Sequence, residues 1–159
     1  MNSLYPARWL ALLLPVSLMA GALGSQYIGG LYPCEMCHWQ RWPHYTAIAL
    51  ALLGFIIPGR GPKTWMIALA GLAVITSGLI GIFHAGVEYR WWEGLTSCTV
   101  AASAGSTAEV LADIWATPVI RCDQPQWTLF GISLAGYNAL ISIPAGILVL
   151  ALLARKGRA

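Results

Sequence analysis

Cys34, Cys37, Cys98 and Cys122 are the residues of this 159-residue chain best suited to covalent chemistry. The first two form a C-x-x-C pair within the segment YPCEMCHWQRWPH, and the other two are spread over a longer stretch. Such a pair can bind zinc, exchange disulfides or form a structural disulfide. A disulfide across two intervening residues closes a very small ring and constrains little of the unfolded chain, so the spacing favours exchange.

Zinc, haem and structural disulfides are the alternative uses of these cysteines. Strong zinc patterns have two closely spaced pairs, and here the second pair is widely spaced, although His38 and His44 could complete a site. The string CEMCH matches the bare attachment motif of a c-type haem, but the short segment around it offers no globular haem pocket. Cys98 and Cys122 could also form one structural disulfide that closes a long loop.

Arg41 follows Cys37 by four residues. On a helix that includes the motif, the two side chains therefore share one face. A permanent cation and a helix N-terminus both favour the thiolate, which is the reactive form of cysteine. An arginine at membrane depth is costly and therefore indicates a functional residue. The alternative is that its side chain extends to the lipid headgroups.

The elements that must position these residues are strongly apolar. The chain is 58% hydrophobic and 9% charged, whereas soluble domains are about 25% charged. Four windows contain no Asp, Glu, Lys or Arg: 9–30, 42–59, 64–87 and 124–154. Continuous apolar runs of roughly 20 residues are typical of helices that cross a bilayer.

The sequence therefore predicts an all-α membrane protein built as a four transmembrane helix bundle. We expect a single integral membrane domain over residues 1–159 and an outer loop at 85–127. The expected crossings are about 9–29, 38–57, 64–84 and 128–153. The N-terminal run, with Arg8 before it and AGA at 20–22, also resembles a secretory signal whose cleavage would leave three crossings.

Charge predicts the orientation of the bundle. Six of the nine Lys and Arg residues fall on one expected side: Arg8, Arg60, Lys63, Arg155, Lys156 and Arg158. All six acidic residues fall on the other: Glu35, Glu88, Glu93, Glu109, Asp113 and Asp123. Because cytoplasmic loops are enriched in Lys and Arg, we expect both termini in the cytoplasm and all four cysteines on the outer face.

The outer loop contains a predicted short amphipathic helix. Ser106 and Glu109 form a capping box, and Pro118 ends the helical pattern. The apolar residues that share one face are Val110, Leu111, Ile114 and Trp115. This helix would lie on the outer membrane surface, or alternatively pack on the loop itself.

A redox role for the C-x-x-C pair requires an electron acceptor. The sequence contains no flavin, dinucleotide or nucleic-acid motif, so we expect membrane lipid but no nucleic acid around it. A pair at the bilayer surface is within reach of a lipid-soluble quinone. Arg41 could hydrogen-bond a quinone carbonyl and stabilise charge that develops on it.

The motif PCEMCHWQR, the four crossings and the cysteines of the outer loop resemble the disulfide bond formation protein B (DsbB) family over nearly the whole chain. The segments HAGVEYRWW and CDQPQWTLFGISLAGYN resemble it less specifically. The resemblance implies a thiol:quinone oxidoreductase of the bacterial inner membrane. Such an enzyme reoxidises a periplasmic thioredoxin-fold dithiol oxidase (DsbA-like) and passes the electrons to ubiquinone or menaquinone.

The resemblance also implies residue roles. The partner would attack Cys98 of a Cys98–Cys122 disulfide, Cys122 would then attack Cys34, and Cys37 beside Arg41 would pass electrons to the quinone. His84 is the candidate for a polar residue that approaches the quinone after the third crossing, with Glu88 as its rival. Gln40 stands where other members carry an acid.

Three other functions share these features. A vitamin K epoxide reductase-like protein has similar logic, but its loop cysteines precede the C-x-x-C pair. A membrane reductant would move electrons in the opposite direction, which the sequence does not decide. A non-enzymatic zinc-binding membrane subunit would hold zinc and show no turnover with quinone.

Overall fold

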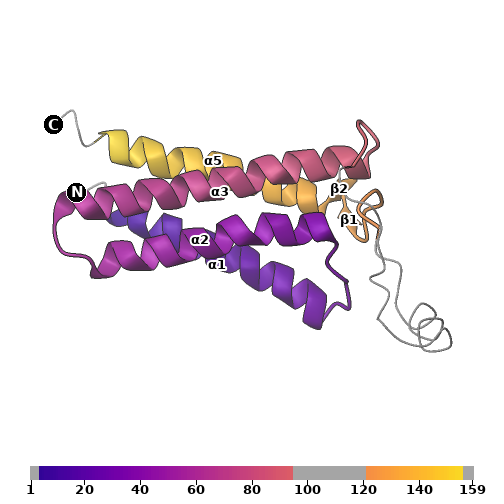
Figure 1. Cartoon of the computed structure of the whole chain (residues 1–159), viewed down its shortest axis with the longest axis horizontal. Coiled ribbons are helices and arrows are strands. Elements are labelled where there is room, and N and C mark those ends of the chain that lie inside the picture. The colour runs from indigo at the N-terminus through magenta and orange to yellow at the C-terminus, as the bar shows by residue number, and fades with distance from the viewer. Residues whose placement is uncertain (1–3, 95–120, 156–159) are drawn as a thin grey trace, which may run out of the picture.

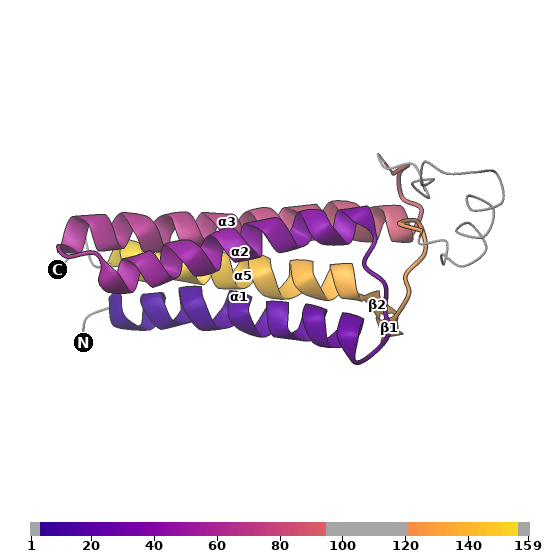
Figure 2. The ribbon, with the colours of Figure 1, turned by 60° about the horizontal axis from the view of Figure 1, so that its bottom comes forward.

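The computed structural model describes residues 4–94 and 121–155 as a bundle of long antiparallel helices capped at one end by a small hairpin (Figures 1 and 2). The helices are α1 (Leu4–Tyr27), α2 (Glu35–Ile56), α3 (Arg60–Glu88) and α5 (Leu134–Ala154). The hairpin pairs β1 (Thr128–Leu129) with β2 (Ile132–Ser133) in antiparallel register. Cys98 and the predicted loop helix around 106–117 lie outside the described residues.

Each helix buries one stripe of side chains at helical spacing. On α1 the buried residues follow one another every four positions: Ala7, Ala11, Pro15 and Met19. On α2 the stripe is Met36, Gln40, His44, Ala47, Ala51 and Gly54. Residues three and four apart share a helix face, so the polar Gln40 and His44 point into the bundle because they fall in register with apolar core positions.

The charges of the described residues are divided unevenly between the two ends of the bundle. The start of α1, the α2–α3 turn and the end of α5 lie together at one end (Figure 1). That end carries the basic residues Arg8, Arg60, Lys63 and Arg155. The hairpin end carries the described acidic residues Glu35, Glu88, Glu93 and Asp123, together with Arg41, Arg90 and Arg121. The bundle therefore has the same-side arrangement on which the predicted orientation depends.

Three of the described helices, α1, α3 and α5, are long and apolar enough to cross a membrane. Many outward-facing side chains on these helices are large and apolar, including Leu13, Leu72, Leu79, Leu140 and Ile147. Surfaces of this kind suit contact with lipid. The predicted crossing on α2 is not apolar enough by the same criterion of length and hydropathy, because its first three turns contain Glu35, Gln40, Arg41 and two histidines.

The fourth helix begins later than the sequence predicts. The expected crossing starts near residue 128, but residues 128–133 form the hairpin and α5 begins at Leu134. Phe130 and Gly131 have φ angles of 49° and 76°, which turn the chain and are incompatible with an α-helix. The Tyr89 hydroxyl donates to Gly131 O (2.8 Å) and accepts from Ser133 N (2.8 Å), which fixes the hairpin to the end of α3.

Close packing of α3 on α5 depends on glycines. A Cβ atom placed on Gly78 would lie 2.6 Å from Ile143 Cγ1, and one on Gly146 would lie 2.5 Å from Ile75 Cγ1. At Gly81 it would lie 2.9 Å from Ala135 O and 3.2 Å from Asn138 Nδ2. Small residues let membrane helices approach backbone to backbone, and here they bring Asn138 within hydrogen-bonding reach of α3.

Gly81→Ala is expected to destabilise the bundle by about 1–3 kcal/mol, because the added methyl group meets the backbone of α5 and must push the helices apart. Thermal unfolding in detergent measures the effect. Gly24→Ala on α1 is the matched control, since no described residue places an atom within 4 Å of its added Cβ, apart from the adjoining backbone of α1 itself. Alanine is the better helix former by up to about 1 kcal/mol, so the control should unfold no earlier than the unmodified protein. Equal melting temperatures for the two variants would contradict the packing argument.

Candidate active site

The C-x-x-C pair forms the N-terminal end of α2. Cys34 is the N-cap residue, with extended backbone, and its Sγ accepts a hydrogen bond from Cys37 N (3.3 Å). Pro33 precedes the cap and disfavours a helical conformation at the residue before it. Glu35 in the first turn is the charge that a helix N-terminus favours. The local sequence therefore starts the helix between the two cysteines.

The two cysteine side chains are in direct contact. Cys34 Sγ donates to Cys37 Sγ at 3.1 Å, and the Cys34 side chain is buried. This donated hydrogen bond and burial raise the pKa of the Cys34 thiol. Cys34 therefore keeps its proton at neutral pH, and Cys37 is the member of the pair that accepts the hydrogen bond and is placed to act as thiolate.

Cys122 packs into the same buried cluster as Cys34, Met36 and Val87. Its two neighbours, an exposed arginine and a partly exposed aspartate, form an ion pair, with Arg121 Nη2 2.5 Å from Asp123 Oδ2. That hydrogen-bonded guanidinium lowers the pKa of the Asp123 carboxyl. The ion pair lies on the exposed side of the segment while Cys122 between the two charges is buried. The sulfur that the sequence assigns to the outer loop thus lies against the C-x-x-C pair.

His84 on α3 also contacts the C-x-x-C pair. Its Nε2 is 3.4 Å from Cys34 Sγ and 3.7 Å from Glu88 Oε1, and its Nδ1 is 2.7 Å from Gln40 Nε2. An amide nitrogen is only a donor, so Nδ1 accepts and Nε2 carries the proton. His84 therefore presents an N–H group to the sulfur of Cys34.

Asn138 on α5 determines this arrangement. Its Nδ2 donates to Gln40 Oε1 (2.8 Å), Ser77 O (3.2 Å) and Ser77 Oγ (3.1 Å). Its Oδ1 accepts from Ser142 Oγ (2.8 Å) and lies 3.0 Å from His44 Nε2. Because Gln40 Oε1 faces Asn138, its amide nitrogen must face His84. A continuous set of hydrogen bonds thus connects α5, α2 and α3.

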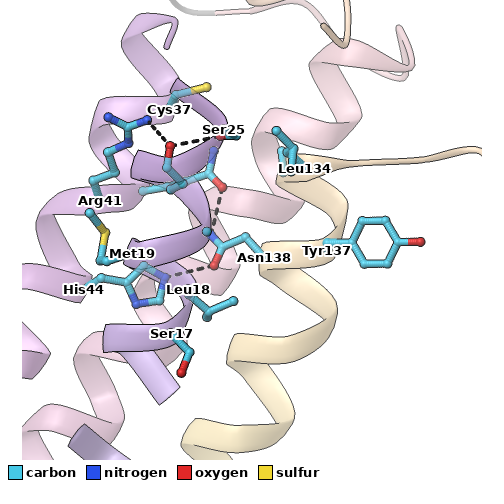
Figure 3. A pocket seen from close by; sticks show the side chains of 14 residues that line it. Ser17, Leu18, Met19, Ser25, Cys37, Arg41, His44, Leu134, Tyr137 and Asn138 are labelled. Atoms are coloured by element: carbon cyan, nitrogen blue, oxygen red, sulfur yellow. Dashed lines mark hydrogen bonds between the residues drawn. The ribbon is translucent and has the colours of Figure 1, made fainter. Parts of the chain in front are cut away.

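Arg41 reaches α1 rather than extending away from the bundle. Its Nη1 donates to Gln26 Oε1 (2.6 Å) and its Nη2 to Ala22 O (3.3 Å). Figure 3 shows the guanidinium beside Cys37 at the same wall of a cavity. The helical spacing of Cys37 and Arg41 predicts this shared face, whereas the partner on α1 could not be inferred from it.

Two cavities meet at this point. The larger cavity has a volume of about 220 Å³ and lies between α1, α2 and the start of α5, with Cys37, Arg41, His44 and Asn138 in its walls (Figure 3). The smaller cavity has a volume of about 60 Å³ and is lined by Cys34, Cys37, Arg41, His84 and Glu88, among others. Cys37 and Arg41 line both. His84 lines only the smaller cavity and reaches the wall of the larger one through Gln40.

A metal could be held here by Cys34, Cys37 and His84, whose ligand atoms lie within 4.8 Å of one another. The hydrogen bonds argue against this use, because a metal-bound nitrogen must be unprotonated and Nε2 of His84 is the protonated one. Of the histidines that the sequence suggested for zinc, His44 is instead bound to Asn138. Within the described residues, the geometry therefore fits thiol chemistry better than a closed zinc site.

Sequence reasoning missed Asn138, Ser77 and Ser142, and it gave Gln40 only a minor role. Ser77 and Ser142 are fully buried, and Ser77 Oγ donates to Gln40 O at 2.8 Å. A lone Asn or Ser in a long apolar run could have been noticed in the sequence, because a buried polar group needs a hydrogen-bond partner. The identity of the partner depends on how the helices pack.

The bundle and the buried thiol cluster define a helical membrane protein with a dithiol at one end. The family model described as "Disulfide bond formation protein DsbB" matches residues 6–154. The chain therefore belongs to the DsbB family and is a membrane protein of disulfide bond formation.

Curated relatives carry the same description. "Disulfide bond formation protein B" of Verminephrobacter eiseniae is 35% identical, covering 96% of this chain and 89% of the relative. The protein of the same name from Alkalilimnicola ehrlichii is 32% identical, covering 87% of this chain and 93% of the relative. That from Acidovorax sp. is 29% identical over 96% and 90%. No solved structure matches the chain significantly.

In the reduced protein, iodoacetamide at neutral pH is expected to modify Cys37 before Cys34. The raised pKa of Cys34 keeps it protonated there, so its alkylation should increase only at a pH above the ordinary thiol range. Tandem mass spectrometry of the Cys34–Cys37 peptide, after alkylation from about pH 6 to about pH 10, distinguishes the two sites.

The control for this experiment is Cys37→Ala, which removes the acceptor of the Cys34 proton. Alkylation of Cys34 should then begin at a lower pH, while burial still slows it. Preferential modification of Cys34 at neutral pH in the unmodified protein would reverse the assignment of the two sulfurs.

Proposed function

We propose that this chain is a membrane thiol:quinone oxidoreductase that reoxidises a periplasmic DsbA-like dithiol oxidase and passes the electrons to a membrane quinone. The observation that carries the proposal is the position of Cys37 on the wall shared by the two cavities. Cys34 and the neighbouring Cys122 lie on the thiol side of this wall, and Arg41, Gln40 and His44 face the larger cavity.

The proposed exchange uses the four cysteines in series. The reduced partner attacks Cys98 of a Cys98–Cys122 disulfide, which releases Cys122 as a thiolate. Cys122 then attacks Cys34 of a Cys34–Cys37 disulfide, and Cys37 leaves as the new thiolate. The second thiol of the partner displaces Cys98, and Cys98 displaces Cys34 from Cys122, so the partner leaves oxidised and Cys34 and Cys37 are both reduced. Each step breaks one S–S bond and forms another, as thiol–disulfide exchange requires. The packing of Cys122 against Cys34 supports the second step.

The larger cavity fits a quinone headgroup in size and chemistry. An apolar cavity of about 150 Å³ admits benzene, so a volume of about 220 Å³ is sufficient for a six-membered ring. Arg41 supplies a cationic donor suited to a carbonyl oxygen, and Cys37 supplies the sulfur. A bound quinone accepts two electrons and two protons while Cys34 and Cys37 lose them and form their disulfide again. Ser17 and Gly21, which are exposed on α1, line the cavity on the side where lipid would be.

We further propose that all four helices cross the bacterial inner membrane, with cytoplasmic termini and periplasmic cysteines. α2 packs along α3, and it comes nearest to α1 towards the end of the bundle away from the hairpin (Figure 2). Its polar first turns lie at the hairpin end, and the remainder is apolar. The basic end of the bundle would face the cytoplasm by the usual enrichment of Lys and Arg.

The decisive test is quinone reduction by the purified protein in detergent, with a reduced thioredoxin-fold dithiol protein as electron donor. Turnover should be lost in Cys37→Ser, because the sulfur between the cavities is removed. Replacing both Cys98 and Cys122 should block oxidation of the protein donor while a small dithiol still drives turnover through Cys34 and Cys37. Folded protein that reduces neither ubiquinone nor menaquinone, and binds stoichiometric zinc, would support the zinc-binding alternative instead.

Arg41→His is expected to raise the KM for quinone by about tenfold or more, because a bond to a charged donor contributes about 1.5–3 kcal/mol. Exchange with the protein donor should change much less. Steady-state kinetics with each substrate varied in turn separates the two effects. Arg90→His, at an exposed position after α3, is the matched control. An unchanged KM for quinone in the Arg41 variant would return Arg41 to a purely structural role on α1.

A further inference from the structure

His44 provides a buried hydrogen-bond acceptor at the larger cavity. The side chain is 3% exposed and lines the cavity together with Leu18 and Met19 (Figure 3). Its Nε2 pairs with Asn138 Oδ1 at 3.0 Å. A carbonyl oxygen only accepts, so Nε2 carries the proton of the neutral ring and Nδ1 has a free lone pair.

Nδ1 of His44 is buried and has no hydrogen-bond partner among the described residues. Buried polar atoms are nearly always paired, since an unpaired one retains the full cost of desolvation. The tautomer is not free to reverse, because Asn138 Nδ2 donates to the backbone carbonyl of Ser77 and to Gln40 Oε1, which leaves Oδ1 facing His44. The atom is almost fully enclosed, so the wall must shift slightly to open it, and a ligand that donates a hydrogen bond would satisfy it.

We propose that His44 makes the larger cavity selective for the hydroquinone form of its ligand, an inference that rests on the quinone function proposed above. The two carbonyls of a quinone only accept hydrogen bonds, so a quinone can pair with Arg41 but not with Nδ1 of His44. The hydroxyls of a hydroquinone both accept and donate, so a hydroquinone can pair with both residues.

This selectivity has a redox consequence. A site that binds the reduced form more tightly makes the bound quinone a stronger oxidant. For a two-electron couple, each tenfold preference for hydroquinone corresponds to about 30 mV. His44 would in this way favour electron flow from the cysteines towards the quinone.

The test measures binding rather than turnover, in a Cys37→Ser background where the ligand is not reduced or oxidised by the pair. Calorimetric titration with ubiquinone-1 and with ubiquinol-1 should show tighter binding of ubiquinol-1. Adding His44→Phe should weaken ubiquinol-1 binding by about tenfold and change ubiquinone-1 binding much less. His44→Gln keeps an amide donor for Asn138 and an acceptor oxygen, so it should recover most of the selectivity.

A second measurement does not depend on how the His44 variants fold. The dimethyl ether of ubiquinol-1 keeps the ring but has no hydroxyl donor, so it should bind about tenfold more weakly than ubiquinol-1 when His44 is present. Equal affinity for the two compounds, or equal losses for quinone and hydroquinone in folded His44→Phe, would overturn the role of His44 while leaving the quinone function intact. Failure of folded protein to bind either ubiquinone-1 or ubiquinol-1 would overturn the quinone assignment and this inference with it.

Discussion

The side-chain amide of Asn138 is the interaction on which the site depends. Its nitrogen faces Gln40 and Ser77, and its oxygen faces His44 and Ser142. Rotating the amide by half a turn would set its oxygen against two other acceptors, Gln40 Oε1 and Ser77 O, and its nitrogen against the donor Ser142 Oγ. The amide of Asn138 on α5 therefore determines which nitrogen carries the proton in His44 and, through Gln40, in His84. Neither histidine lies on that helix.

This arrangement requires the helices to approach closely. Asn138 reaches Ser77 because Gly81 leaves no side chain between α3 and α5. In low dielectric surroundings a satisfied polar network is strong, and one that loses a member is costly. Packing and chemistry are thus coupled, because a shift of α5 that is small in distance would unpair Gln40 and change what His84 presents to Cys34.

The sequence predicted the helices and the C-x-x-C face but not the connections between helices. The charge-free window at 124–154 was interpreted as helix from 128, because an absence of charge does not distinguish a hairpin from a helix. The turn is encoded by Phe130 and Gly131 and by the distant hydroxyl of Tyr89.

The candidate site, like the fold, was predictable from the sequence only where the residues are close along the chain. Cys37 and Arg41 are four residues apart, so their shared face could be predicted from local geometry. Asn138 and Gln40 are separated by 98 positions, and no periodicity connects them. The roles predicted for Cys98, and for the outer loop around it, stay predictions because they fall outside the described residues.

Cys34 caps α2 with the sulfur that disulfide exchange would use. A side-chain cap with an oxygen acceptor stabilises a helix by about 1 kcal/mol, and sulfur is a weaker acceptor. A disulfide sulfur keeps its lone pairs but must point towards its partner, so the hydrogen bond that caps α2 depends on which cysteine Cys34 is bonded to. Any change in the disulfide bonding of Cys34 would therefore also change the local stability of the first turn of α2, in which Cys37 lies.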